Sequence, residues 1–278
     1  MVTINNKIDT LIQLMLSQHY LAGNTWCFVF NFRSHLYFKR NKIRVQIKYN
    51  YKTKLYSVSN GKFTIVTFNR RLANLDYRNG IERRISFLQD VYFLHSIDFL
   101  DKDIVIDCGA NCGDLYLALK EINPNLMYYG FEPSPKDFVS LSANIGGGKL
   151  FNYALAHMSG LYKMALETEG ANSSIIFPPK YDEIVTVQGI RLDEVEDFKN
   201  VSIKLLKIEV EGFEPEVLLG ASNLLPRTEY ITLDVGPERG LNQEETFEPV
   251  DKFLKSVNFS LIGKGSPRKI VLYRNNLS

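Results

Sequence analysis

The sequence is poor in the residues that build covalent or metal-linked frameworks. Among its 278 residues there are 3 cysteines, 4 histidines and 1 tryptophan. Three cysteines do not make a disulfide framework. Cys108 and Cys112 stand close together but have no second pair to complete a zinc site. The scattered histidines form no triad pattern, so we expect neither a disulfide-stapled domain, nor a zinc module, nor a histidine-based triad.

Long apolar runs are also missing. No uninterrupted apolar stretch approaches the ~20 residues that a membrane helix needs, and the apolar segment 94–108 is interrupted by Asp98, Asp101, Lys102 and Asp103. The opening residues MVTINNKIDT lack the charged start and apolar core of a signal peptide. We therefore expect no membrane span and a cytoplasmic, reducing location, with peripheral attachment to a membrane left open.

Acidic residues are scarce in the first part of the chain. Residues 1–100 hold 15 Lys/Arg and 5 Asp/Glu, about +10, which leaves 18 basic and 26 acidic residues, about −8, in the remainder. Such a basic part indicates an anionic partner, substrate or surface, or simply a solvated charged face. Tyr and Phe interleave with basic residues from Arg33 to Tyr56, but no recognised RNA- or DNA-binding motif accompanies them, so nucleic acid is not the expected partner.

The front of the chain predicts a helix followed by a small antiparallel β element. Apolar residues recur there with helical spacing first, and then alternate with polar ones as in a half-buried strand. Asn60-Gly61 between two strand-like runs is a strong hairpin signal. We expect the first helix to dock on the body or on a second copy of the chain, as a homodimer contact. The expected helices and strands cover 4–21, 42–49, 55–58, 62–68 and 81–96.

From residue 103 onward strands and helices alternate, which is typical of a parallel α/β sheet with its ligand at the carboxyl ends of the strands. A short loop joins the last two strands, so the sheet should end antiparallel. We expect a Rossmann-like α/β fold with a mostly parallel seven-stranded sheet and an antiparallel last strand, preceded by an N-terminal helix and a small β-hairpin element. The expected strands are 104–107, 126–132, 149–155, 203–210, 229–235, 258–263 and 269–274, and the helices 114–121, 135–144, 215–225 and 249–257.

Two further absences narrow the role of the stretch VIDCGANCGD, residues 105–114. It lacks the Gly-Lys-Ser/Thr of a P-loop and the middle glycine of a G-x-G-x-x-G dinucleotide loop. Asp107 ends the strand, where it would repel an anionic pyrophosphate. A cofactor with a positive amino group, such as S-adenosylmethionine, would be well placed there, and Gly109 and Gly113 would let the backbone run close beneath it.

Glu132 ends the second expected strand, 19 residues after Gly113. In dinucleotide folds an acid about 20 residues after the loop binds ribose hydroxyls, and the same geometry serves any nucleoside with both hydroxyls free. The alternative is a helix N-terminal cap before Pro133. Glu132 is therefore a candidate for the ribose of the cofactor.

Together these segments resemble the FkbM-type methyltransferases, which belong to a Rossmann-like class that uses S-adenosylmethionine. The resemblance rests on VIDCGANCG (105–113), FEPSP (131–135), NYALAHMSG (152–160), VQGIRLDEV (187–195) and KIEVEGFEPEVLLGA (207–221). YRNGIERR (77–84) also resembles the lead-in helix of members found with glycan-building enzymes. The resemblance implies a class I methyltransferase domain over 77–278, behind a helix-plus-β element over 1–76. It implies cofactor contacts at Asp107, Gly109, Ala110, Asn111, Gly113, Glu132, Pro133, Ser134, Ala154 and Leu155.

One position departs from the family pattern. The family commonly carries an acid near the end of the third-strand motif, where this chain has His157. A neutral histidine could accept a hydrogen bond from the adenine amino group, but a protonated one could not. The adenine contact is then left to backbone groups at Ala154 and Leu155.

The fourth expected strand carries the candidate catalytic residues Lys207, Glu209 and Glu211. They alternate, so their side chains share one side of the sheet if the strand persists. Methyl transfer to a hydroxyl needs proton removal, and a carboxylate within ~3 Å can act as general base. We predict Glu209 or Glu211 as that base, with Lys207 holding the carboxylates; the alternative is a structural ion-pair cluster. Asp234 could join them around a divalent ion, but no metal-loop spacing is present and no metal site is predicted.

The resemblance implies a methyltransferase that acts on a sugar hydroxyl of a glycan, polysaccharide or glycolipid, with an acceptor that could be anionic or lipid-linked. Two other functions stay open. One is methylation of a non-sugar small molecule. The other is a nucleic-acid-binding module with a degenerate methyltransferase domain, whose affinity for RNA would fall steeply with salt. An NAD-dependent enzyme is disfavoured by the missing middle glycine.

Overall fold

A computed structural model of the chain describes residues 2–16, 22–41, 45–167 and 173–277. The chain divides into two compact units, residues 1–86 and 87–278. The boundary falls within helix α4 (Ile81–Val91), and the domain boundary expected after residue 76 stays a prediction. No helix in the described ranges is long and apolar enough to cross a membrane.

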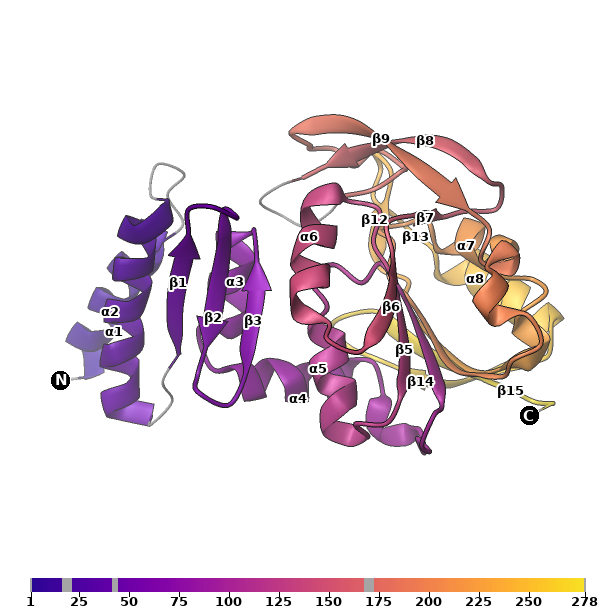
Figure 1. The fold of residues 1–278 in the computed structure, drawn as a ribbon, viewed down its shortest axis with the longest axis horizontal. Helices are drawn as coiled ribbons and strands as arrows, with labels where there is room; N and C mark the ends of the chain where they lie inside the picture. The colour runs from indigo at the N-terminus through magenta and orange to yellow at the C-terminus, as the bar shows by residue number, and fades with distance from the viewer. Residues whose placement is uncertain (1, 17–21, 42–44, 168–172, 278) are drawn as a thin grey trace. The chain divides into compact units, whose positions relative to one another are not determined.

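The first unit consists of helices and one three-stranded antiparallel sheet in the order β1-β2-β3 (Figure 1). The predicted hairpin is confirmed, because β2 and β3 pair antiparallel around Asn60-Gly61. The predicted first helix and first strand are also present, but their expected parts at 17–21 and 42–44 lie outside the described residues. Its elements are α1 (Val2–Leu16), α2 (Gly23–Asn41), β1 (Gln46–Asn50), β2 (Leu55–Ser59), β3 (Thr64–Thr67) and α3 (Arg70–Tyr77).

Helix α2, which the sequence pattern did not predict, covers the outer edge of β1. The Asn31 amide accepts from Ile47 N–H at 2.8 Å and donates to Ile47 O at 2.9 Å. Ser34 Oγ accepts from Val45 N–H at 3.0 Å and donates to Val45 O. An edge strand leaves such backbone groups unpaired, and these two side chains satisfy them. Trp26 and Phe30 of the same helix are buried.

The second unit is built on a seven-stranded sheet in the order β14-β15-β11-β10-β4-β5-β6. Its neighbouring strands pair in parallel, except that β15 is antiparallel to both β11 and β14. The predicted fold class is confirmed (Figure 1). The strands are β4 (Ile104–Cys108), β5 (Met127–Phe131), β6 (Gly148–Phe151), β10 (Ile203–Ile208), β11 (Thr228–Asp234), β14 (Phe259–Lys264) and β15 (Ile270–Asn275).

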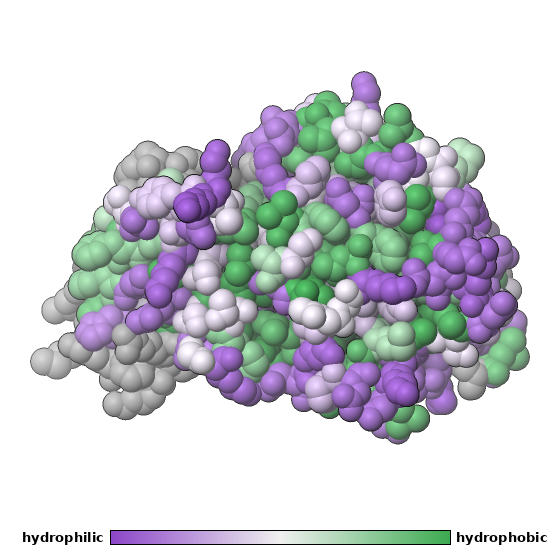
Figure 2. Space-filling model, in the orientation of Figure 1, coloured by the Kyte–Doolittle hydropathy of each residue, from purple (hydrophilic) through white to green (hydrophobic). Residues whose placement is uncertain are grey.

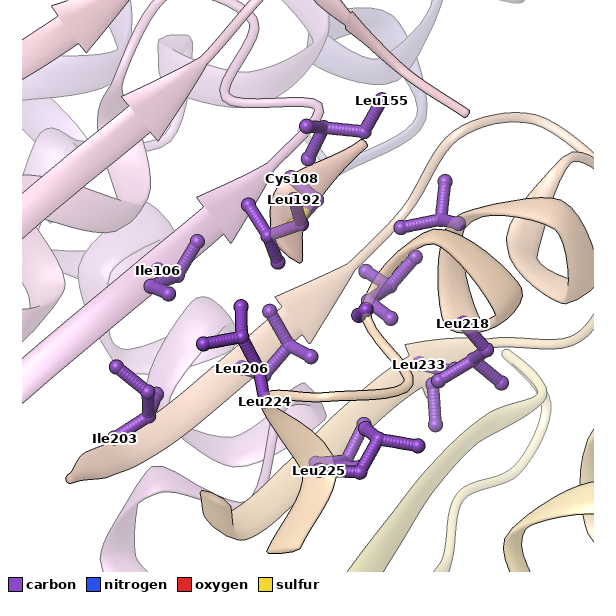
Figure 3. Packing of buried hydrophobic residues seen from close by; sticks show 14 of the residues in the cluster. Ile106, Cys108, Leu155, Leu192, Ile203, Leu206, Leu218, Leu224, Leu225 and Leu233 are labelled. Atoms are coloured by element: carbon purple, nitrogen blue, oxygen red, sulfur yellow. The ribbon is translucent and has the colours of Figure 1, made fainter. Parts of the chain in front are cut away.

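Helices cover both faces of this sheet, with α5 and α6 on one face and α7 and α8 on the other (Figure 1). The second face carries a large apolar core, to which Ile106, Cys108 and Leu206 from the strands and Leu218 of α7 all belong (Figure 3). Because side chains alternate along a strand, the intervening residues Asp107 and Lys207 face the other side. The helices are α5 (Asp114–Ile122), α6 (Pro135–Asn144), α7 (Glu214–Gly220) and α8 (Phe247–Ser256), with short 3₁₀ turns at Leu94–Ser96, Leu192–Glu194, Glu196–Phe198 and Leu225–Arg227.

Two strand predictions need correction, and further strands were not predicted. The third strand, expected over 149–155, ends at Phe151, and Ala154–Leu155 forms β7 of a separate sheet with the order β7-β9-β8. The strands β8 (Gly160–Leu166) and β9 (Glu183–Ile190) of that sheet were not predicted. The fourth strand, expected to reach residue 210, ends at Ile208. A short pair, β12 (Pro237–Arg239) and β13 (Glu244–Glu245), follows β11.

Candidate active site

The sheet topology gathers the predicted site segments at one edge. The strands β10, β4 and β5 are neighbours and run parallel, so their carboxyl ends lie side by side. The glycine loop after β4, the segment Glu132–Ser134 after β5 and Lys207 near the end of β10 therefore meet there. This edge is where open α/β sheets bind their ligands.

The glycine loop uses the backbone N–H groups of residues 109–113 inside the protein. The acceptors are Phe131 O for Gly109 and Ala110, Ala110 O for Gly113, Glu132 Oε2 for Asn111 and Asn111 Oδ1 for Cys112, at 2.7–3.0 Å. A phosphate cradle needs N–H groups directed at the anion. The loop offers a pyrophosphate none of these five donors, which supports a cofactor without phosphate.

The two glycines of the loop are required by the packing of the chain itself. Gly109 has a φ of 80°, and a Cβ there would lie 1.9 Å from Glu209 O. Gly113 has a φ of 83°, and a Cβ there would lie 2.8 Å from Leu141 Cδ1 and 2.9 Å from Ile145 Cδ1. The sequence suggested room for the cofactor at both positions. The atoms that a Cβ would meet belong to the segment after β10 and to the region of α6.

Glu132 joins the glycine loop to the end of β5. It is buried, and its Oε2 and Oε1 accept from the N–H groups of Asn111 and Ser134, each at 2.8 Å. Burial and the nearby Asp137 raise the pKa of Glu132 to about 8, against the lowering effect of these two bonds. A carboxylate oxygen has two acceptor positions, so each oxygen retains one for a ribose hydroxyl. The N-cap of α6 is Ser134, whose Oγ accepts from Asp137 N–H.

Asp107 and Lys207 form a buried ion pair at paired positions of β4 and β10. Lys207 Nζ lies 2.9 Å from Asp107 Oδ1 and donates to Gly109 O at 2.8 Å, and Tyr128 Oη donates to Asp107 Oδ2 at 2.7 Å. Burial alone would lower the pKa of Lys207, but the charges of Asp107 and Tyr92 and the hydrogen bond to Asp107 together outweigh it, and the pKa is raised. The protein thus already neutralises Asp107, and its predicted contact with the cofactor amino group stays a prediction.

Glu209 lies just beyond the end of β10, and partners from distant segments hold both of its oxygens. Tyr92 Oη donates to Oε2, which also lies 3.4 Å from Lys207 Nζ, and Arg268 Nη2 donates to Oε1. Arg268 Nε also donates to Asp234 Oδ2 at 2.9 Å. Sequence reasoning missed Tyr92 and Arg268, because neither stands in a motif. Glu209 and Lys207 therefore belong to one ion-pair cluster, and their predicted catalytic roles stay predictions.

Glu211 lies in a turn, not on a strand. The strand has ended at Ile208, so the condition under which Glu211 would share a side with Lys207 and Glu209 is not met. Glu211 has a φ of 56°, which is uncommon for a residue with a side chain. Its Oε2 is buried and has no hydrogen-bond partner.

Three side chains hold this turn in place. Glu214 Oε1 accepts from Val210 N–H at 3.2 Å and from Gly212 N–H at 3.1 Å. Ser174, from the segment between β8 and β9, donates to Glu211 O at 2.8 Å. Arg239 Nη1 donates to Gly212 O at 2.6 Å. The turn is thus fixed from three parts of the chain, which is how an unfavourable backbone conformation persists at a functional site.

Acidic neighbours surround the Glu211 carboxyl. Burial raises its pKa well above the ordinary value, the charges of Glu238, Glu214 and Asp234 raise it further, and the charge of Lys207 lowers it less. Burial and Asp234 also raise the pKa of Glu238 to about 8. A buried carboxyl with a raised pKa is a stronger base once it is ionised.

Asp234 does not join Glu209 and Glu211 as a metal site in this arrangement. Arg268 lies between Asp234 and Glu209 and bonds to both. No group of three or more His, Cys, Asp or Glu residues within the described ranges is arranged to hold a metal ion.

The segment after β6 lies beside the ribose-binding candidate. Asn152 Nδ2 donates to Glu132 O at 2.7 Å, which fixes the segment at the end of β5. The strand β7, Ala154–Leu155, then pairs in parallel with β9. His157 Nδ1 is buried without a hydrogen-bond partner. The predicted adenine contacts at Ala154 and Leu155 stay predictions.

These residues fit S-adenosylmethionine, which has an ammonium, a sulfonium and no phosphate. The glycine loop directs no backbone donor of residues 109–113 toward an anion. Glu132 retains acceptor positions for two ribose hydroxyls. Glu132 thus offers acceptors to a ribose, and residues 109–113 offer no backbone donor to a pyrophosphate.

Comparison with known proteins identifies the family. The family model described as Methyltransferase FkbM domain matches residues 107–261, more than half of the chain. The chain is 24% identical over 217 residues to the 31-O-demethyl-FK506 methyltransferase FkbM of Streptomyces tacrolimicus, covering 65% of this chain and 82% of that protein. It is also similar to solved structures of a methyltransferase FkbM from Methylobacillus flagellatus KT (13% identity, TM-score 0.49) and of TrmK from M. capricolum with S-adenosyl-homocysteine (12% identity, TM-score 0.39). The first match covers 67% of this chain and 47% of the solved one, and the second 68% of each. The chain belongs to the FkbM methyltransferase family and is an S-adenosylmethionine-dependent methyltransferase.

Proposed function

We propose that the chain is an O-methyltransferase whose acceptor is a sugar hydroxyl of a glycan, polysaccharide or glycolipid. The name of the Streptomyces relative, a 31-O-demethyl-FK506 methyltransferase, supports an oxygen acceptor. The resemblance of the segment 77–84 to members found with glycan-building enzymes supports a sugar.

The observation that carries the proposal is the carboxyl of Glu211. Its backbone is held at a positive φ by three separate contacts, and its Oε2 is buried with no partner in the protein. A hydroxyl proton of the acceptor is the partner that this oxygen lacks. Glu209 is less suited to the role, because Tyr92 and Arg268 hold its two oxygens.

The proposed chemistry needs one proton transfer by the protein. When bound, S-adenosylmethionine supplies an electrophilic methyl group. Glu211 accepts the proton of the acceptor hydroxyl, and such general base catalysis typically contributes ~10²–10⁴-fold to the rate. Lys207 and Arg268 form ion pairs with Glu209. Glu209 therefore acts as a positioning residue, which holds the side chains at this edge of the sheet in place.

The test compares Glu211→Gln with Glu209→Gln and the wild type. Labelled S-adenosylmethionine is incubated with cell-envelope glycans from a strain that lacks the gene, and the labelled product is identified by mass spectrometry. We expect a methylated sugar with the wild-type enzyme. We expect Glu211→Gln to lower kcat by ~10²–10⁴-fold while its Kd for S-adenosylhomocysteine, measured by calorimetry, stays within about twofold.

Other results would contradict the proposal. If the wild-type protein bound neither S-adenosylmethionine nor S-adenosylhomocysteine, this cofactor would be excluded. An unchanged kcat in Glu211→Gln would exclude Glu211 as the general base. Label in RNA, or RNA binding that both variants retain, would favour the nucleic-acid-binding alternative.

A second acceptor class has an observation of its own. The Streptomyces relative is named for a non-sugar acceptor, demethylated FK506, so a hydroxyl of a non-sugar small molecule is the competing candidate. Label in a small molecule that mass spectrometry shows to contain no sugar would support it. The role of Glu211 would be the same for either hydroxyl.

A further inference from the structure

The first unit exposes an apolar face on its two leading helices. The side chains of Phe28, Phe32 and Leu36 recur at every fourth position of α2, and α1 adds a second group. Figure 2 shows a pale green area over these helices. We call this set the helix face; its members are Leu11, Leu14, Met15, Phe28, Phe32 and Leu36, each 38–72% exposed.

The packing of the unit leaves the helix face without a role. Trp26 and Phe30 of α2 are buried, and Asn31 and Ser34 bond to the edge of β1. At 3.6 residues per turn, Phe32 lies on the opposite side of the helix from Trp26 and Phe30. Helix α1 behaves alike, with Ile12 and Leu16 buried. Each helix therefore has one apolar side for the unit and another for something else.

The net charge of the first unit indicates which kind of partner covers the helix face. Residues 1–86 contain 15 Lys/Arg and 3 Asp/Glu, a net +12, and the remaining 18 basic and 28 acidic residues give −10. Arg33 is buried in an ion pair with Asp9, but other cations are open to solvent. The exposed ones include Lys48, Lys52, Lys54, Lys62 and Arg83.

Three partners could cover an apolar face on a basic unit. A second copy would bring two units of +12 together, and their repulsion opposes the homodimer that the first helix suggested. Nucleic acid would attract the cations and stack on Phe28 and Phe32, but it would leave Leu11, Leu14 and Met15 exposed. An anionic bilayer accepts aliphatic and aromatic side chains and attracts Lys and Arg to its surface.

We propose that the helix face docks the protein on an anionic lipid bilayer. Its aromatic and aliphatic side chains enter the headgroup–acyl boundary, and the exposed Lys and Arg residues of the unit attract the anionic headgroups. This attachment is peripheral and does not depend on the identity of the methyl acceptor.

The experiment measures co-sedimentation of the full-length chain with vesicles. Vesicles of phosphatidylcholine and phosphatidylglycerol are compared with vesicles of phosphatidylcholine alone, at low and high salt. The test variant is Phe28→Ser/Phe32→Ser. The matched control is Leu161→Ser/Leu241→Ser, which removes two apolar side chains of the second unit that are at least as exposed as Phe28 and Phe32. Far-ultraviolet circular dichroism shows that each variant keeps its helices, and calorimetry with S-adenosylhomocysteine shows that the second unit keeps its fold.

We expect the wild type and the control to bind the anionic vesicles and to dissociate as salt screens the charges. We expect the test variant to lose binding at least tenfold. Failure of the wild type to bind, equal binding to phosphatidylcholine alone, or unchanged binding of the test variant would overturn the proposal. So would a doubled mass in light scattering that the test variant reduces to a monomer, which would assign the face to a second copy. If the wild type bound a short RNA but not vesicles, and the test variant lost the RNA binding, the helix face would be assigned to nucleic acid.

Discussion

Glu214 should make the protein less stable as the pH rises. It is completely buried at the start of α7. Oε1 accepts from two backbone N–H groups, and Oε2 accepts from Thr246 Oγ1 at 3.1 Å. Burial raises its pKa from 4.5 to about 7, even though these bonds lower it. The substitution Glu214→Gln keeps the acceptor for both N–H groups and lets the amide donate to the Thr246 hydroxyl, so it removes the ionisation alone.

The magnitude follows from the two pKa values. The unfolded carboxyl ionises near 4.5 and the folded one near 7, so ionisation favours the unfolded state increasingly between these values. Each pH unit in this window costs about 1.4 kcal/mol. The full cost is about 3 kcal/mol above pH 7, and it is about 1 kcal/mol near pH 5. Below the unfolded pKa there is no cost.

The assay is urea denaturation of the wild type and Glu214→Gln at about pH 5 and about pH 8. The variant should be more stable at both values, and its advantage should grow by about 2 kcal/mol toward the higher pH. A difference in the free energy of unfolding that does not change with pH would refute the reasoning. It would mean that the carboxyl ionises alike in the folded and unfolded states.

Three further predictions concern the edge of the sheet. Gly109→Ala should destabilise the protein by at least about 1–2 kcal/mol because of its positive φ, and the clash with Glu209 O should add to this cost. Gly146→Ala should not destabilise the protein, because there is open space around Gly146. Thermal unfolding compares the two variants. Glu132→Gln should cost about 1–3 kcal/mol and weaken S-adenosylhomocysteine binding, because both oxygens accept from backbone N–H groups and an amide nitrogen cannot; stability like the wild type would contradict this. In the wild type kcat should rise with pH as Glu211 loses its proton. Glu238→Gln should move this rise to lower pH, because Glu238 is the strongest charge that raises the pKa of Glu211. A pH profile of kcat that does not move would exclude this coupling.

Local signals predicted some elements closely. Helix α6 has its predicted bounds, 135–144, because Pro135 favours a first helical position and glycines follow the end. The order of strands and helices after residue 103 was enough to predict a mostly parallel sheet, since right-handed crossovers leave few possible topologies. Helix α2 was missed because it is apolar on two sides and so shows no single apolar stripe.

The candidate site was also predicted only in part. The glycine loop, Glu132 and the KIEVEG segment each lie in one short stretch of sequence at a strand end, and the carboxyl ends of parallel strands had to bring them together. Sequence could not place Tyr92 and Arg268 on Glu209, because they come from segments far from the motif. Nor could it show that Glu211 leaves the strand, since the contacts that turn its backbone come from Ser174 and Arg239.

The sequence by itself determined the family, the cofactor and the segments that meet at one edge of the sheet, because residue types and their spacing carry that information locally. It also determined the charge of the first unit. Only the tertiary structure decided which carboxylate is held by cations and which is left without a partner, because burial and hydrogen bonding depend on segments that meet only in the fold. For the same reason it alone showed that α1 and α2 keep an apolar side exposed after their own unit has packed.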